Sequence, residues 1–269
     1  MDTKFGIKIV FTVILLTFVN FLLDWIQGSA SNAIDYGFQT ISNFLIFILL
    51  GYSIIRSDLS GIRLSLSVFG IYYLIGSLNL LVEAFIFKLT DFSGIISLIP
   101  RSLITALVIA PVLVYLSNKW QYKSRGIEFE ARPAIGWIWR IVVGDVLYLV
   151  FYIVAGLTLI HVFPDLVKFY NEKTPPPPEL IFGVQLIRGL VFSATAILVS
   201  RTTDLSLSKK AVLIGLIFSI IGGIAPLILP SAEMPPNIRL GHGFEVGISN
   251  FLYGLLLGYL LGQKPKNPL

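Results

Sequence analysis

The sequence contains no cysteine and only two histidines, His161 and His242. Without cysteine the chain has no disulfide framework, no thiolate metal ligand and no cysteine nucleophile. With two histidines, a metal site built from three or more imidazoles is excluded as well. Carboxylates, hydroxyls, amides and arginines are therefore the main groups left to carry any chemistry.

Charge is scarce too, because charged residues make up 13% of the 269 residues while hydrophobic residues make up 55%. A soluble protein of this length cannot bury that much apolar surface, so we expect lipid to replace water around most of the chain. In a membrane protein the net charge of +5 indicates orientation and contact with anionic lipid headgroups rather than nucleic acid. The expected partner is thus the lipid bilayer.

Eight apolar segments are long enough to cross a bilayer, which takes roughly 20 residues per helix. They lie at about 7–26, 38–55, 64–88, 96–116, 136–161, 181–200, 211–230 and 244–262. No segment between them is large enough to fold alone. The sequence therefore predicts one all-α domain spanning residues 1–269, a polytopic membrane helix bundle with about eight transmembrane helices.

Basic residues set the expected orientation of this bundle. If the N-terminus is cytoplasmic, thirteen lysines and arginines fall in inner segments and four in outer segments, while three lie within helices. Cytoplasmic segments of membrane proteins carry such an excess. We therefore expect both termini in the cytoplasm and an integral protein of the cell (inner or plasma) membrane.

Two pairs of segments resemble each other within the chain. Residues 41–52 (ISNFLIFILLGY) and 248–259 (ISNFLYGLLLGY) align without gaps, with nine identities in 12 positions. A shorter match joins 56–63 to 201–209, where Asp-Leu-Ser stands between basic residues in both. The two matches have different offsets, so they do not define one duplication. Duplicated helical hairpins stay a hypothesis, and internal repeats are common in transporter folds.

Charged side chains inside the apolar segments are few, and a charge in hydrocarbon normally faces the bundle and finds a partner. Glu83 and Arg101 lie near the same outer connection. Arg188 and Asp145 lie at membrane depths close enough for the arginine side chain to span the difference. We therefore predict that Glu83 pairs with Arg101 and Asp145 with Arg188. Such a buried charge network would fix helix packing.

The arginines also support another interpretation, an outward-facing polar pocket for an anionic solute or a lipid headgroup. An arginine fork binds carboxylate and phosphate oxygens in pairs. The candidate substrate-binding residues lie in the outer halves of helices or beside the last helix, and they are Arg101, Arg188, Arg239, His242, Glu245 and Ser249.

The last apolar segment carries two distinct faces. With about 100° per residue, a polar stripe forms on one face of the helix and a glycine pair on another. The stripe consists of His242, Glu245, Ser249 and Tyr253, and the pair of Gly254 and Gly258. Small residues four positions apart let helices approach closely. The glycines therefore predict a packing face for another helix, or for another chain in a homo- or hetero-oligomer.

Metal and cofactor sites find little support in the sequence. His242 and Glu245 are spaced so that both could ligate one ion, with His161 as a third ligand. The HxxE pattern is common and nothing fixes the distance to His161, so we predict no metal and no cofactor. No Ser/His motif, phosphate loop or dinucleotide fingerprint is recognisable.

Three functions remain open. The favoured one is a transporter or lipid-handling permease, because Gly222-Gly223 followed by Pro226 should kink the seventh helix, and transporters use broken helices to bind substrates. The second is a membrane-embedded hydrolase or protease acting on a lipid or peptide, with His242 and Glu245 as acid and base. The third is a non-catalytic subunit whose polar stripe packs against a partner chain.

Overall fold

The computed structural model describes residues 3–26, 32–86, 92–123, 128–129, 131–171, 176–230 and 234–263. Within these ranges the protein is all-helical and has no strand. Eight of its helices are long and apolar enough to cross a membrane, which confirms the predicted number of spans. The architecture is that of a multi-pass membrane protein.

Five of the first seven spans are single α-helices. They are α1 (Thr3–Ile26), α2 (Ala33–Ile55), α5 (Phe92–Leu116), α6 (Ala134–Val162) and α8 (Pro178–Thr202). The eighth span, α11 (Pro236–Leu261), is also a single helix. It begins eight residues before the predicted start at 244, because Pro236 suits the first turn of a helix, where its missing N–H costs nothing.

The third and seventh spans each combine an α-helix, a π-helix and a second α-helix. The third consists of α3 (Gly61–Ile71), η1 (Tyr72–Leu78) and α4 (Asn79–Ile86). The seventh consists of α9 (Leu207–Leu216), η2 (Ile217–Ile224) and α10 (Ala225–Ile228). A short helix, α7 (Pro164–Asn171), lies in the segment that the sequence suggested was a loop.

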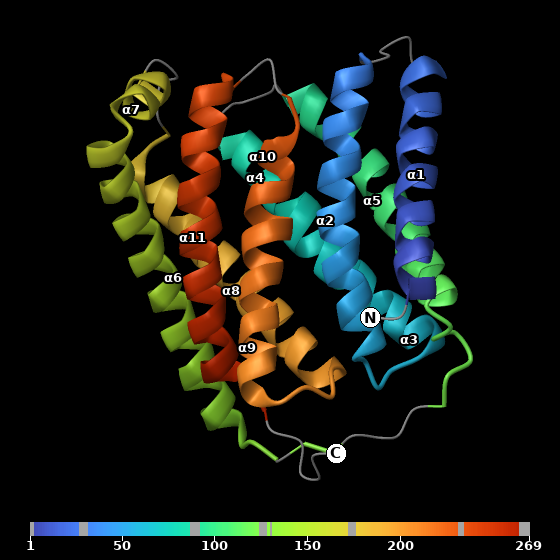
Figure 1. Ribbon diagram of the computed structural model, residues 1–269. Coiled ribbons are helices and arrows are strands. Elements are labelled where there is room, and N and C mark those ends of the chain that lie inside the picture. Colours follow the sequence, from blue (N-terminus) through green and yellow to red (C-terminus); the bar gives the residue numbers. More distant parts are fainter. Residues whose placement is uncertain are drawn as a thin grey trace.

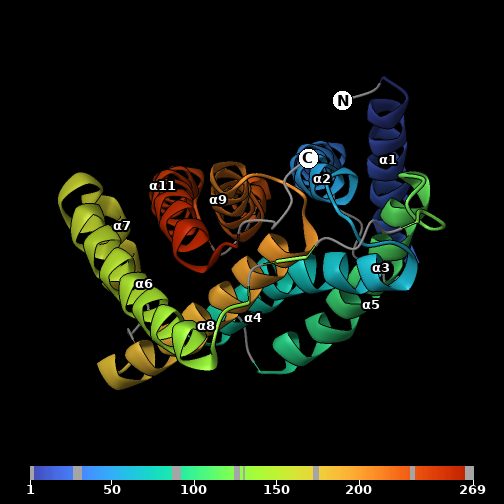
Figure 2. The same cartoon turned by 90° about the horizontal axis from the view of Figure 1, so that it is seen from below.

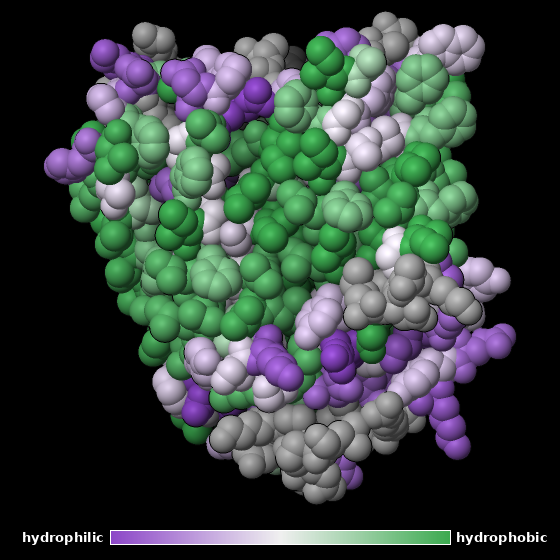
Figure 3. Space-filling view, in the orientation of Figure 1, coloured by the Kyte–Doolittle hydropathy of each residue, from purple (hydrophilic) through white to green (hydrophobic). Residues whose placement is uncertain are grey.

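On the face shown in Figure 3, an apolar band lies between two polar ends of the bundle. The start of α1 and the end of α11 lie at the same end of the bundle, the lower one in Figure 1. We call this the inner end and the opposite one the outer end. An even number of spans places both helix termini on one side of a bilayer.

The sidedness itself is testable, because the natural chain contains no cysteine. The substitution Lys123→Cys introduces a cysteine after α5, at the inner end. The substitution Pro177→Cys introduces one just before α8, at the outer end. A thiol reagent that does not cross membranes should label the cysteine at 177 in intact cells. It should label the cysteine at 123 only after the membrane is permeabilised. Labelling of both from the same side would contradict eight spans, and reversed labelling would contradict the cytoplasmic termini.

The eight spans form two halves with the same internal arrangement. In each half the first span packs on the second, the third on the fourth and the first on the fourth: α1–α2, α3–α5 and α1–α5 correspond to α6–α8, α9–α11 and α6–α11. The second span of each half also contacts the third span of the other half (Figures 1 and 2). The halves are therefore related by an approximate two-fold axis that runs along the bundle.

Backbone hydrogen bonds between the halves follow this symmetry residue by residue. Ser57 and Thr203 form an isolated antiparallel bridge, which corresponds to a shift of 146 positions (203 − 57). The N–H of Asp58 donates to the carbonyl of Thr202 (3.1 Å), and the N–H of Asp204 donates to the carbonyl of Arg56 (2.9 Å). The two bonds of any antiparallel bridge are related in this way, but the same shift of 146 also aligns Asp58-Leu59-Ser60 with Asp204-Leu205-Ser206, so the bridge joins equivalent loops.

The two π-helices meet on the same axis. A Cβ placed on Gly76 of η1 would lie 3.2 Å from Cγ2 of Ile221, and one placed on Gly222 of η2 would lie 2.9 Å from Cγ2 of Ile75. These contacts are again related by 146 positions. The sequence predicted a proline kink in the seventh span. That span has a π-helix over Gly222-Gly223 just before Pro226, and the third span has one at the equivalent place without any proline.

The two sequence matches have different structural meanings. The shorter one, 56–63 with 201–209, joins the equivalent loops that form the bridge between the halves. The longer one, 41–52 with 248–259, joins α2 to α11, which are the second and eighth spans and are not equivalent in the two-fold arrangement. The shorter match therefore identifies the repeat.

Two cationic side chains bind the backbone where α11 ends, at the inner end of the bundle. Arg132 donates to the carbonyls of Leu261 (3.1 Å) and Gly262 (3.0 Å), which end α11. Lys210 is fully buried and donates to the carbonyl of Gln263 (3.1 Å). Cations at a helix C-terminus satisfy carbonyls that have no partner within the helix.

Candidate functional site

A cavity of about 380 Å³ lies in the N-terminal half, among the first four spans and the seventh. It is formed by the outer part of α2, the outer part of the third span and the outer part of α5. Its polar lining consists of Asn20, Gln39, Ser42, Asn43, Tyr72, Ser77, Arg101, Ser102 and Thr105. The remaining walls are mainly leucine and isoleucine.

Two amides in this cavity have buried polar atoms without hydrogen-bond partners. They are Oε1 of Gln39 and Nδ2 of Asn43, both on α2. By contrast, the hydroxyl of Ser42 donates to the carbonyl of Ala225 (2.8 Å) in the seventh span. Buried polar atoms in folded proteins nearly always have a partner. Two of the amides that line the cavity therefore each have one polar atom, an acceptor on Gln39 and a donor on Asn43, that no group of the protein satisfies.

Arg101 stands at the rim of the cavity, with its side chain 35% exposed. Its Nη2 lies 2.8 Å from Oδ1 of Asp24 on α1, and the hydroxyl of Tyr36 donates to Oδ2 of the same carboxylate (3.2 Å). The predicted pairing of Arg101 with Glu83 is thus wrong. Asp24 and Asn20 on α1 both face the bundle, since they are 9% and 8% exposed.

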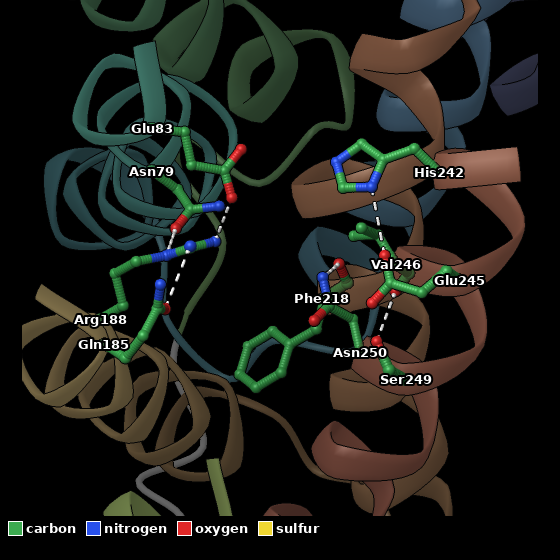
Figure 4. Close-up of polar contacts among 10 residues, drawn as sticks. All are labelled: Asn79, Glu83, Gln185, Arg188, Phe218, His242, Glu245, Val246, Ser249 and Asn250. Carbon is green, nitrogen blue, oxygen red and sulfur yellow. Dashed lines mark hydrogen bonds and ion pairs between the residues drawn. The ribbon is translucent and has the colours of Figure 1, made fainter. Parts of the chain in front are cut away.

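Arg188 is buried in a cluster of its own in the C-terminal half (Figure 4). Its Nη2 lies 2.5 Å from Oε1 of Glu83, its Nε donates to Oδ1 of Asn79 (2.7 Å), and its Nη1 donates to Oε1 of Gln185 (3.2 Å). The ring centre of Tyr148 lies 5.8 Å from the guanidinium carbon. The partner of Arg188 is therefore Glu83, and the predicted pair with Asp145 is wrong.

Asp145 instead lies on α6 against Gly189 of α8, where any side chain at 189 would clash with the carboxylate. Its Oδ1 is buried and accepts no hydrogen bond. The hydroxyls of Ser193 and Tyr253, contributed by α8 and α11, are likewise buried. Arg188 points away from this place toward the third span, because Glu83 and Asn79 are both there.

The polar stripe of α11 is paired within the helix. Nδ1 of His242 lies 3.1 Å from Oε2 of Glu245, and the two side chains are 19% and 13% exposed. The hydroxyl of Ser249 donates to the carbonyl of Val246 at 3.5 Å (Figure 4). Farther along the stripe, the ring of Tyr253 packs among aromatic rings of α6, α8 and η2. The whole stripe thus faces the protein rather than lipid.

The glycine face of α11 packs on α9 of the same chain. A Cβ on Gly254 would lie 2.8 Å from the Cα of Gly215, and one on Gly258 would lie 2.5 Å from the Cα of Ala211. The close helix approach predicted for these glycines is therefore made within the chain, rather than to a second chain.

Arg239 borders a second, more apolar groove of about 640 Å³ between α2, the seventh span and α11. Its Nη1 donates to the carbonyl of Leu229, and its Nε is buried without a partner. The six predicted binding residues thus fall in four places: the cavity, the Arg188 cluster, this groove and the stripe.

The cavity residues on α2 were not selected in the sequence, although Gln39, Ser42 and Asn43 follow the i, i+3, i+4 pattern of one helix face. They carry no charge, and charge was the criterion of selection. Among the residues that the structure describes, no group of three or more His, Asp or Glu is placed to hold a metal ion. No protein family, no curated protein and no solved structure matches the chain.

Proposed function

We propose that the chain is a transporter of the cell membrane, and that a small solute binds in the cavity of the N-terminal half. The observation that carries the proposal is the pair of open polar atoms, Oε1 of Gln39 and Nδ2 of Asn43, in a space of about 380 Å³. Binding pockets for small molecules commonly range from about 300 to 1,000 Å³ and combine apolar walls with a few polar groups.

The lining indicates the chemistry of the solute. Apolar atoms, including those of seven leucine and isoleucine side chains, make up most of the wall, so the body of the solute is apolar. The two open amide atoms require a hydrogen-bond donor and an acceptor on the solute. Arg101 adds a cationic donor at the rim, but Asp24 balances its charge. We therefore favour a small amphipathic solute that is neutral or zwitterionic.

Two features of the fold support transport rather than binding alone. The cavity is lined by residues from the outer parts of the spans and by none from the loops at the inner end. The halves meet along a two-fold axis at two π-helices, a geometry in which one half can tilt against the other. Repeated halves around a central site are the usual basis of alternating access.

A lipid is the second candidate substrate. The apolar groove beside Arg239 could hold an acyl chain, with the arginine at headgroup level. This candidate differs from the first in place, because it uses the space between α2, the seventh span and α11.

Transport is tested by filling the cavity. Ser102→Phe adds an aromatic ring to the lining, whereas Gly183→Phe adds the same ring on α8 where nothing lies within 4 Å of the Cβ position. Proteoliposomes would be loaded with a defined mixture of amino acids, amides, organic acids and nucleosides, and efflux measured by mass spectrometry. At least one solute should leave faster through the natural protein and through Gly183→Phe than through protein-free vesicles. Ser102→Phe should abolish that difference.

The proposal fails if no member of the mixture moves faster than through protein-free vesicles. It also fails if Ser102→Phe transports as well as the natural chain, since the solute would then not pass through the cavity.

A further inference from the structure

The two-fold symmetry relates the cavity to the Arg188 cluster. Adding 146 positions to Gln39 gives Gln185, and adding 146 to Ser42 gives Arg188. In the opposite direction, Leu229 of the cavity wall corresponds to Glu83. Three members of the cluster, Gln185, Arg188 and Glu83, thus occupy positions equivalent to three lining residues of the cavity.

Contacts confirm that these positions are equivalent in space. The side chain of Ser42 on α2 donates to residue 225 in the seventh span (2.8 Å), and that of Arg188 on α8 donates to Asn79 in the third (2.7 Å). These two hydrogen bonds are related by the same 146 positions as the bridge at the inner end. The symmetry therefore holds from the inner end to the level of the cavity.

The two sites differ in what fills them. In the C-terminal half the guanidinium of Arg188 donates to Oε1 of Gln185 (3.2 Å). In the N-terminal half Oε1 of the equivalent Gln39 has no partner. Serine at 42 is too short to reach it, and the space that the arginine takes in one half belongs to the cavity in the other.

We infer that the fold contains two copies of one binding cavity, and that the side chain of Arg188 permanently occupies the C-terminal copy. In the open copy, Oε1 of Gln39 accepts a hydrogen bond from an N–H group of the solute. The closed copy is thus a site for a guanidinium or amine cation, supplied by the chain itself. The open copy has Leu229 where the closed copy has Glu83. Its ligand therefore needs an N–H group, as the guanidinium of Arg188 has, but it needs no positive charge. An amide or an uncharged amine meets that requirement. The hydrogen bond between Gln39 and the solute rests on the proposed function, whereas the occupation of the closed copy by Arg188 does not.

The closed copy is tested by emptying it. Arg188→Ala removes the guanidinium and leaves Glu83, Asn79 and Gln185 open. The variant should unfold at a lower temperature than the natural protein in detergent. Methylguanidinium should raise that temperature by several degrees with saturating dependence, because a ligand that binds only the folded state stabilises it. Tetramethylammonium, which has no N–H, should not, and Glu83→Gln combined with Arg188→Ala should lose the rescue.

A second measurement applies even if Arg188→Ala does not fold. Arg188→Ser with Glu83→Leu copies the residues of the open cavity into the C-terminal half and leaves no charge unpaired. Gln185→Cys in this background should react with a small thiol-reactive amine at a rate close to that of Gln39→Cys in the natural background. In the presence of Arg188 and Glu83, Gln185→Cys should react at least tenfold more slowly. No rescue by methylguanidinium, or no gain in reactivity at 185, would overturn the duplicated cavity.

The open copy is tested with Gln39→Leu in the efflux assay. It should lower the efflux of amide- and amine-bearing solutes at least tenfold. Equal efflux through Gln39→Leu and the natural chain would overturn the N–H assignment. That result would leave transport through the cavity intact, because transport is overturned by the absence of protein-dependent efflux or by unchanged efflux through Ser102→Phe, so the two failures are distinguishable.

Discussion

Replacing Arg188 by leucine is expected to destabilise the protein by about 3–5 kcal/mol, the usual cost of removing one partner of a buried ion pair. Glu83 would keep its charge without a counter-ion, and the acceptors of Asn79 and Gln185 would lose their donor. The loss should be visible as a lower unfolding temperature in detergent.

The double variant Arg188→Leu with Glu83→Leu is the informative comparison. It removes both charges, so its loss of stability should be clearly smaller than the sum of the two single losses. Asp145→Leu is the matched control, because Asp145 is a membrane carboxylate that does not contact Arg188. Its effect should add to that of Arg188→Leu within about 0.5 kcal/mol. Strong coupling with Asp145 instead of Glu83 would contradict the observed pairing.

The other large effect is expected at Gly258. A side chain there would meet the Cα of Ala211 at 2.5 Å, and backbone cannot move aside as a flexible side chain can. Gly258→Leu should therefore force α11 away from α9 and cost at least about 3 kcal/mol, the upper part of the range for overpacked cores. The measurement is the yield of monodisperse protein after size-exclusion chromatography, together with its unfolding temperature.

Gly156→Leu on α6 is the control, since nothing lies within 4 Å of its Cβ position. It should leave both yield and unfolding temperature close to those of the natural chain, with a small gain from helix propensity. If Gly258→Leu behaved like Gly156→Leu, the close contact of α11 with α9 would not exist in the protein.

The membrane spans were predictable because a bilayer imposes length and hydrophobicity on each helix independently. Ion-pair partners were not, because sequence position gives the depth of a charge in the membrane but not which helix lies opposite. Glu83 and Arg101 were expected to pair through a shared connection. In the fold, Glu83 turns toward α8 and Arg101 toward α1.

The cavity was not predictable for a different reason. A cavity exists where side chains are short or absent, as at Ser42 and Gly76, and the space they leave depends on helices distant in sequence. The repeat was hidden as well, because the equivalent positions 42 and 188 carry serine and arginine. Only the loops at 56–63 and 201–209 kept enough identity to show it.

The bridge between Ser57 and Thr203 has a consequence for how the protein is made. At about 5–20 residues per second, a ribosome needs roughly 7–30 s to synthesise the chain between these two residues. During that interval the first half is completed while the N–H of Asp58 and the carbonyl of Arg56 still lack their partners at 202 and 204. Both groups lie in a loop at the inner end, where water can hydrate them. Closure of the seam between the halves is therefore a late event of biogenesis, which begins only when the sixth span has been inserted.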